Sequence, residues 1–133
     1  MTRPDQVRSD NHSKDTRPEV WVGHVSLKVR DFRQSLGFFN LIGMRQVARM
    51  PGLAVMELRG GTHLILRADS NSTPGAAGFD LMVDDLIRAR QRLVEAGYQP
   101  TEIRKQFVHR VFDVIEPSGH SIQFNNSHVA GAV

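Results

Sequence analysis

Apolar and polar residues alternate along the first patterned stretch of the chain, residues 20–29. One face of an extended segment here would carry three apolar side chains: Val25, Leu27 and Val29. The other face would carry three polar ones: His24, Ser26 and Lys28. Such strict alternation predicts a strand with one buried face and one open face.

Helical spacing follows directly after this strand. Asp31 can cap a helix whose apolar residues recur every three or four positions, and Gly43 can end that helix. These apolar positions are Phe32, Leu36, Phe39 and Ile42. Turn residues then separate three predicted strands, at 44–50, 53–59 and 62–67. The first half therefore has the order strand, helix, three strands.

The same order begins again after a loop at 68–77 that is rich in Ser, Asn, Pro and Gly. Apolar residues alternate from 79 to 83, and Asp84 or Asp85 can cap a second helix that ends at Gly97. Three further strands are predicted, at 99–105, 108–115 and 121–125.

Two landmarks recur at one offset along the chain. Residues 29–32 correspond to residues 83–86, which lie 54 positions later, and the helix-ending Gly43 corresponds to Gly97 at the same distance. A common offset at two places with defined mechanical roles indicates an internal duplication. The alternative is a pair of unrelated strand–helix units with similar caps.

The composition limits what kind of protein this is. The 133 residues are 40% hydrophobic and 23% charged, which suffices for a buried core. Residues 1–19 are polar and show no period, so we expect a disordered or loosely docked arm there. The absence of cysteine excludes a thiol nucleophile, a thiolate zinc site and a disulfide framework.

Charge and hydropathy also bear on partners and location. The net charge is +3, but the arginines are scattered singly, so we predict no nucleic-acid partner. No apolar run approaches the roughly 20 residues that span a bilayer, and the first residues lack the pattern of a signal peptide. We therefore expect a cytoplasmic protein without a membrane partner.

Two motifs resemble the vicinal oxygen chelate superfamily, which includes glyoxalase I, extradiol dioxygenases and bleomycin-resistance proteins. They are residues 23–29 followed by Asp31, and residues 116–123 with their Glu-Pro-Ser-Gly turn. The resemblance implies an α+β fold of two tandem βαβββ modules that form a glyoxalase-like mixed sheet with an open cleft. We place the domain at 20–128, with module one at 20–67, a linker at 68–77 and module two at 78–128. The resemblance also implies a homodimer, in which halves of different chains meet at the clefts.

The resemblance further implies four ligand positions for a divalent metal. The positions in this chain are His24, Ile65, Gly78 and Gln123, and two of these residues cannot bind metal. His63 lies two residues before Ile65 on the same strand face, so it is the nearest replacement. We therefore expect either a weakly held Fe, Mn, Ni, Co or Zn ion on His24, His63 and Gln123, or no metal.

Alternation places further polar side chains on the open faces of the strands, where they could line a ligand-binding cleft. These cleft residues are Ser26, Lys28, Arg67, Asp80, Gln123 and Asn125. Such a mixture suits an anionic or oxygen-rich small molecule, although a face that is merely exposed to water would look similar. His120, at the tip of the last turn, is expected to be solvated.

Two functions remain open at this point. The first is a metal-dependent or histidine-assisted lyase, isomerase or dioxygenase acting on a small oxygenated substrate, with His24 and His63 as catalytic residues. The second is a non-catalytic protein that sequesters a drug or toxin, as bleomycin-resistance proteins do. The retention of both histidines favours the first function, and the loss of two ligand positions favours the second.

Overall fold

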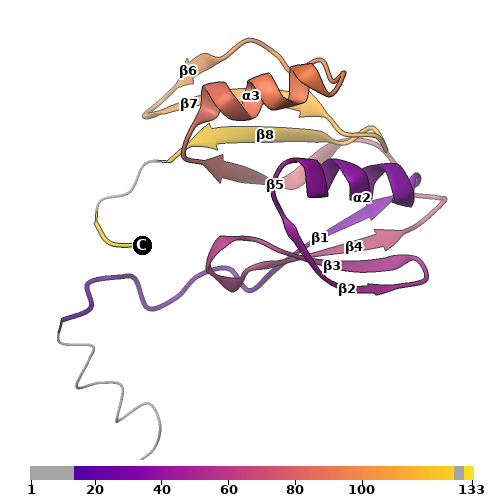
Figure 1. Ribbon diagram of the computed structural model, residues 1–133, viewed down its shortest axis with the longest axis horizontal. Coiled ribbons are helices and arrows are strands. Elements are labelled where there is room, and N and C mark those ends of the chain that lie inside the picture. Colours follow the sequence, from indigo (N-terminus) through magenta and orange to yellow (C-terminus); the bar gives the residue numbers. More distant parts are fainter. Residues whose placement is uncertain (1–13, 128–130) are drawn as a thin grey trace, which may run out of the picture.

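A computed structural model describes residues 14–127 and 131–133, and it confirms the predicted α+β order (Figure 1). Module one consists of β1 (His24–Val29), α2 (Phe32–Leu41), β2 (Arg45–Met50), β3 (Leu53–Glu57), a 3-10 turn (Arg59–Gly61) and β4 (His63–Ala68). Module two consists of β5 (Ala76–Val83), α3 (Leu86–Glu95), β6 (Arg104–Gln106), β7 (His109–Ile115) and β8 (Ser121–Asn126). Residues 1–13 of the predicted arm and His128, at the end of the predicted domain, lie outside the described residues.

Each module forms its own four-stranded mixed sheet. The strand orders are β1-β4-β3-β2 and β5-β8-β7-β6, with the first and last strands of each module parallel and adjacent. Val29 pairs with Ala68 in module one, and Val83 pairs with Asn126 in module two. The first strands are therefore related by the predicted offset of 54 residues and the last strands by 58, which is the geometry of a duplicated unit.

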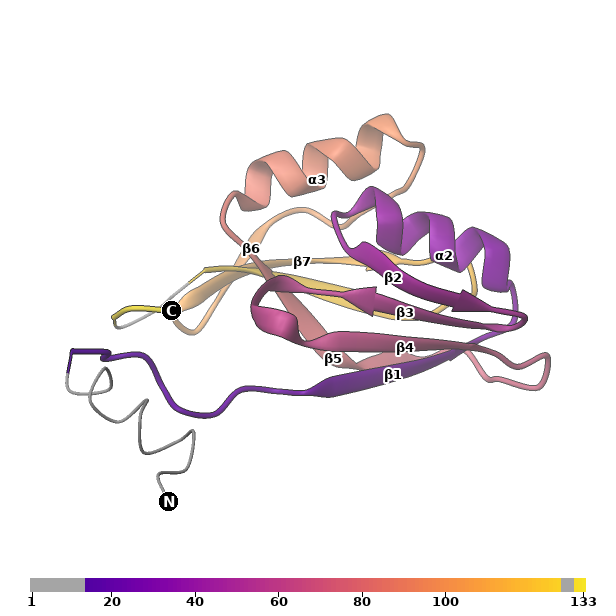
Figure 2. The ribbon, with the colours of Figure 1, turned by 60° about the horizontal axis from the view of Figure 1, so that its bottom comes forward.

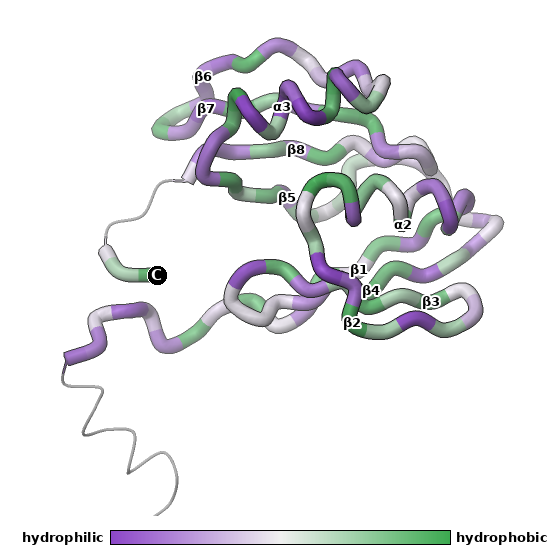
Figure 3. Tube along the Cα trace, viewed as in Figure 1, coloured by the Kyte–Doolittle hydropathy of each residue, from purple (hydrophilic) through white to green (hydrophobic). Residues whose placement is uncertain are grey.

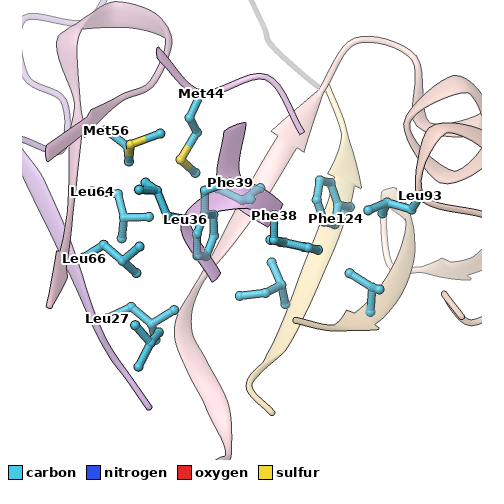
Figure 4. Packing of buried hydrophobic residues seen from close by; sticks show 14 of the residues in the cluster. Leu27, Leu36, Phe38, Phe39, Met44, Met56, Leu64, Leu66, Leu93 and Phe124 are labelled. Carbon is cyan, nitrogen blue, oxygen red and sulfur yellow. The ribbon is translucent and has the colours of Figure 1, made fainter. Parts of the chain in front are cut away.

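Both helices cover the same side of the two sheets (Figure 2). Along α2 and α3 the chain alternates between hydrophobic and hydrophilic residues (Figure 3), so each helix can bury one side. Phe38 and Phe39 of α2 lie in one buried cluster with Leu93 of α3 and Phe124 of β8 (Figure 4). The two modules therefore share a single hydrophobic core. No helix among the described residues has the length and apolar character required to cross a membrane.

The helix boundaries follow the predicted local chemistry. Asp31 caps α2 by accepting a hydrogen bond from the backbone N–H of Gln34, and Asp85 caps α3 through Arg88 in the same way. Asp84, the other candidate cap, instead forms an ion pair with Arg59 at 2.7 Å.

Three strands begin three or more residues away from their predicted starts. Strand β1 begins at His24 rather than near residue 20. Strand β5 begins at Ala76, within the predicted linker, because Ala76 pairs with Ser121. Strand β6 covers only residues 104–106 rather than 99–105, because the carbonyls of Pro100 and Thr101 accept hydrogen bonds from a side chain, that of Arg90, instead of from a neighbouring strand.

The turn between β7 and β8 also differs, because His120 is buried and not solvated. Only 6% of its surface is exposed, and its Nε2 lies 2.7 Å from the carbonyl oxygen of Lys28 in module one. Glu116, in the same turn, is buried and accepts hydrogen bonds from the Ser35 hydroxyl at 2.5 Å and from the backbone N–H of His120 at 2.9 Å. The Ser118 hydroxyl accepts from the backbone N–H of Asp31. These contacts fasten the turn of module two to β1 and α2 of module one.

Candidate functional site

The strand positions that face away from the helices form two separate polar surfaces, one on each sheet. Their neighbours in sequence, such as Leu27, Leu66 and Phe124, are buried toward the helices. We call the first surface the module-one face: His24, Ser26, Lys28, His63, Ile65 and Arg67. We call the second the module-two face: Asp80, Met82, Asp113, Ser121, Gln123 and Asn125.

The predicted cleft residues are therefore divided between the two sheets of one chain. Three of them, Ser26, Lys28 and Arg67, are exposed on the module-one face. On the module-two face Asp80 is exposed and Gln123 half-buried, whereas Asn125 is buried and offers little surface to a ligand. Each module thus carries its own half of the predicted cleft.

His24 and His63 are the two predicted catalytic residues, and the fold brings them together. They are direct partners in the parallel pairing of β1 and β4. Their rings have centroids 5.8 Å apart and an interplanar angle of 33°. A single ligand bound on this face would therefore contact both imidazoles, and an imidazole is a common general acid or base in enzymes.

Glu57 is a member of this histidine cluster that the sequence analysis did not identify. It pairs with His63 across the β3–β4 hairpin, and its Oε2 lies 3.7 Å from the His63 Nε2. Its Oε1 accepts hydrogen bonds from Arg45, including one from Nε at 2.8 Å. Glu57 and His63 stand at equal distances from Gly60 in the sequence, and this symmetry about the hairpin turn could have revealed the pairing.

The side-chain hydrogen bond from Arg45 is the largest influence on Glu57 and lowers the pKa of that carboxyl. Burial opposes this change, while the charges of Arg45 and His63 reinforce it. A carboxyl whose folded-state pKa is depressed stabilises the fold above its unfolded pKa. That contribution is lost as the pH falls through the folded-state pKa.

Replacing Arg45 by glutamine should therefore raise the pKa of Glu57 toward its ordinary value, since the largest cause of the depression is removed. A carbon-13 NMR titration of the Glu57 carboxyl measures this directly. Arg59→Gln is the matched control, because it removes the arginine that lowers the pKa of Asp84 and should leave Glu57 unchanged. An unchanged Glu57 titration in Arg45→Gln would contradict this description of the cluster.

A pocket of about 550 Å³ opens on the module-two face. Its lining consists of Ala76, Ala77, Gly78, Phe79, Asp80, Asp113, Ser121 and Gln123. Asp80 pairs in register with Gln123, and the Nε2 of Gln123 donates a hydrogen bond to Asp113 Oδ1 at 3.3 Å. Arg104 forms an ion pair with Asp113 at 2.6 Å. Asp80 is then the pocket carboxylate that has no ion pair within the described part of the chain.

A distortion of β5 forms one wall of this pocket. The pairing of β5 with β8 changes register between Ala76 and Asp80, and Gly78, between them, has a φ of +85°. This left-handed conformation is readily adopted only by residues without a side chain. Gly78 occupies the position that corresponds to His24 by the 54-residue offset. The backbone conformation there favours glycine, and the lack of a side chain leaves the pocket wall open.

The side chains present in one chain do not complete the predicted metal site. His24 and His63 lie together, but Gln123 belongs to the other sheet and is engaged with Asp113. Glu57 is the nearest further oxygen ligand, yet Arg45 occupies it with a positive charge that opposes cation binding. Within residues 14–127 and 131–133, no group of three His, Asp or Glu side chains is arranged to hold a metal ion.

Comparison with known sequences places most of the chain in one family model. Residues 21–124 match the model described as the Glyoxalase/Bleomycin resistance protein/Dioxygenase superfamily. None of the curated proteins matches the chain.

Comparison with solved structures finds the same fold in proteins with different activities. Lactoylglutathione lyase from Agrobacterium tumefaciens is 18% identical, with a TM-score of 0.66, and the match covers 87% of this chain and 100% of that one. A bleomycin-binding protein complexed with bleomycin is 18% identical, with a TM-score of 0.63 and coverages of 82% and 99%. The oxidase ChaP-H2 is 16% identical, with a TM-score of 0.68 and coverages of 86% and 98%. At these identities the likeness concerns the fold alone.

Proposed function

Since the chain belongs to the Glyoxalase/Bleomycin resistance protein/Dioxygenase superfamily, we propose that it is a small-molecule-binding protein whose ligand occupies the pocket on the module-two face. The proposed activity is sequestration, without chemical change of the ligand. The homodimer and the cytoplasmic location expected from the sequence stay predictions.

The observation that carries this proposal is the chemistry of the pocket lining. Asp80 supplies an exposed carboxylate, while Ser121 and Gln123 supply a hydroxyl and an amide beside it. Phe79 and two alanines add apolar surface to the same wall. Half of the eight lining residues are polar, and convergent polar groups of this kind can fix the orientation of a bound small molecule. The carboxylate favours a ligand that presents an ammonium or another hydrogen-bond donor.

The structural neighbours support binding as one activity of this fold. One of them is a bleomycin-binding protein in complex with bleomycin, whereas another is a lyase. None of the described residues that line the pocket is a histidine, and the pocket lies on a different sheet from the His24–His63 pair. We therefore favour binding over catalysis at this pocket.

A titration with n-butylammonium chloride and with bleomycin, followed by amide NMR shifts, tests the proposal. We expect at least one of them to shift the amides of β5 and β8. Asp80→Asn should weaken that binding by about tenfold or more, as the loss of a charged hydrogen bond implies. Asp84→Asn is the control, because Asp84 lies just beyond β5 and pairs with Arg59 outside the pocket. Failure of both probes to bind, or equal binding by the two variants, would contradict the proposal.

A second candidate function is a histidine-assisted enzyme, and the contact between His24 and His63 favours it. In that case one imidazole acts as a general base, and Glu57 orients the His63 ring. Thermal melts with Mn, Fe, Ni, Co and Zn salts separate the two candidates, since an ion that binds only the native state must raise its stability. Under the binding proposal no salt raises the melting temperature. A rise that His24→Ala abolishes would favour the enzyme.

A further inference from the structure

Two cationic side chains lie directly opposite each other on the module-one face. Lys28 of β1 and Arg67 of β4 are register partners in the parallel pairing, and both are exposed on the side away from the helices. Like charges placed directly opposite each other on neighbouring strands repel and destabilise the pair. An anion bound between the two side chains would relieve this repulsion.

The carboxylates of module one, together with Asp69, which directly follows β4, are all engaged elsewhere. Asp31 caps α2, Glu57 binds Arg45, and Asp69 accepts a hydrogen bond from the backbone N–H of Asn71 at 2.9 Å. No carboxylate in the described part of the chain forms an ion pair with Lys28 or Arg67. Within the described residues, the fold thus places two cationic side chains together and supplies no ion-pair partner for either of them.

Hydrogen-bond donors surround these two charges on the same face. Ser26 precedes Lys28 by two residues on β1, so its hydroxyl projects from the same side, and His24 follows the same alternation one step further. The planar guanidinium of an arginine fits the oxygens of a carboxylate or phosphate, and lysine adds a compact charge. Ile65, opposite Ser26, supplies an apolar contact between the charged row and the histidine row.

We propose that Lys28, Arg67 and Ser26 form a binding site for an oxyanion, such as a phosphate or carboxylate group. This inference rests on the proposed function, because it takes the outward sheet faces to be the ligand-binding surfaces of the protein. It adds a second site that shares no residue with the pocket around Asp80. The two faces then select opposite charges, with an anionic group on module one and a donor group on module two.

Titration of the full chain with inorganic phosphate at constant ionic strength, followed by amide NMR shifts, tests the site. We expect phosphate to shift the amides of β1 and β4 more than equal concentrations of chloride do. Succinate and acetate in parallel titrations show whether the site prefers phosphate or carboxylate. Lys28→Gln and Arg67→Gln should each raise the dissociation constant by about tenfold, as the loss of one charge-assisted hydrogen bond implies.

The matched control is Arg33→Gln, which makes the same charge change on α2, whose helix lies on the opposite side of the sheet. It should bind phosphate as the wild type does, and so should Asp80→Asn. Absence of phosphate- or carboxylate-specific shifts, or equal weakening by Arg33→Gln, would overturn the inference. If the wild-type protein bound phosphate but neither n-butylammonium nor bleomycin, the proposed function of the pocket would be contradicted, and the anion site would stand.

Discussion

Phe124→Ala is expected to lower the free energy of unfolding by about 3–5 kcal/mol, the range found when a large core aromatic is truncated. Phe124 is 1% exposed and stacks on Phe112, with ring centroids 4.9 Å apart and an interplanar angle of 6°. Figure 4 shows it between Phe38 of module one and Leu93 of module two, where the core crosses from one module to the other. The cavity would therefore open at the junction of both halves.

Chemical denaturation followed by circular dichroism measures this loss, and Phe107→Ala provides the control. Phe107 is the same residue type but is 89% exposed at the β6–β7 turn, so its truncation should change stability by no more than about 0.5 kcal/mol. Similar effects of the two substitutions would mean that the shared core is not the main source of stability. Because small domains are stable by only about 5–15 kcal/mol, the Phe124 variant should lose a large share of its stability.

Glu116→Ala is the second substitution with a large expected effect. It removes the acceptor of the Ser35 hydroxyl and of the His120 backbone N–H, both of which are buried. The His120 N–H is then buried without a partner, and the Ser35 hydroxyl exchanges a charged acceptor for Ser118 Oγ, which lies 2.6 Å away. Each hydrogen bond lost from a buried charged group costs about 1–3 kcal/mol. Thermal or chemical denaturation should therefore show a loss of several kcal/mol, with both modules unfolding in one transition.

Two further variants make this second prediction specific. Glu116→Gln keeps one acceptor oxygen and should cost less than alanine. Glu102→Ala removes a carboxylate whose side chain is 93% exposed in its ion pair with Arg90, and it should have little effect. If Glu116→Ala were as mild as Glu102→Ala, the buried turn would not hold the modules together.

Local sequence patterns predicted the parts of this fold that local interactions determine. The alternation around Leu27 and the spacing around Leu36 depend on neighbours within a few residues, and so does capping by Asp31. The 54-residue offset held because the two modules repeat the same local units. His120 was misplaced because its burial depends on the carbonyl of Lys28, 92 residues away in the sequence. No periodicity records such a contact.

The same distinction, between local interactions and contacts that are distant in the sequence, applies to the candidate site. The pairing of His24 with His63 follows from strand adjacency and alternation, which a sequence can reveal once the fold is inferred. Glu57 and Asp113 could not be predicted in this way, because the family resemblance points only to the first and last strands of each module, whereas these two carboxylates lie on β3 and β7. Gln123 was grouped with the histidines by analogy, and within one chain it lies on the other sheet, so its part in a shared metal site stays a prediction.

The bond between Ser35 and Glu116 has a consequence for the order in which the protein is made. The two residues are 81 positions apart in the sequence. Helix α2 therefore leaves the ribosome long before Glu116, whose carboxylate accepts the hydrogen bond from Ser35, has been synthesised. Domains generally fold as units while synthesis proceeds from the N-terminus. Here the first half of the chain cannot complete its buried hydrogen bonds, and Ser35 stays hydrated, until Glu116 has emerged. Any pause in translation between these two codons would lengthen the time during which the apolar side of α2 is available to chaperones.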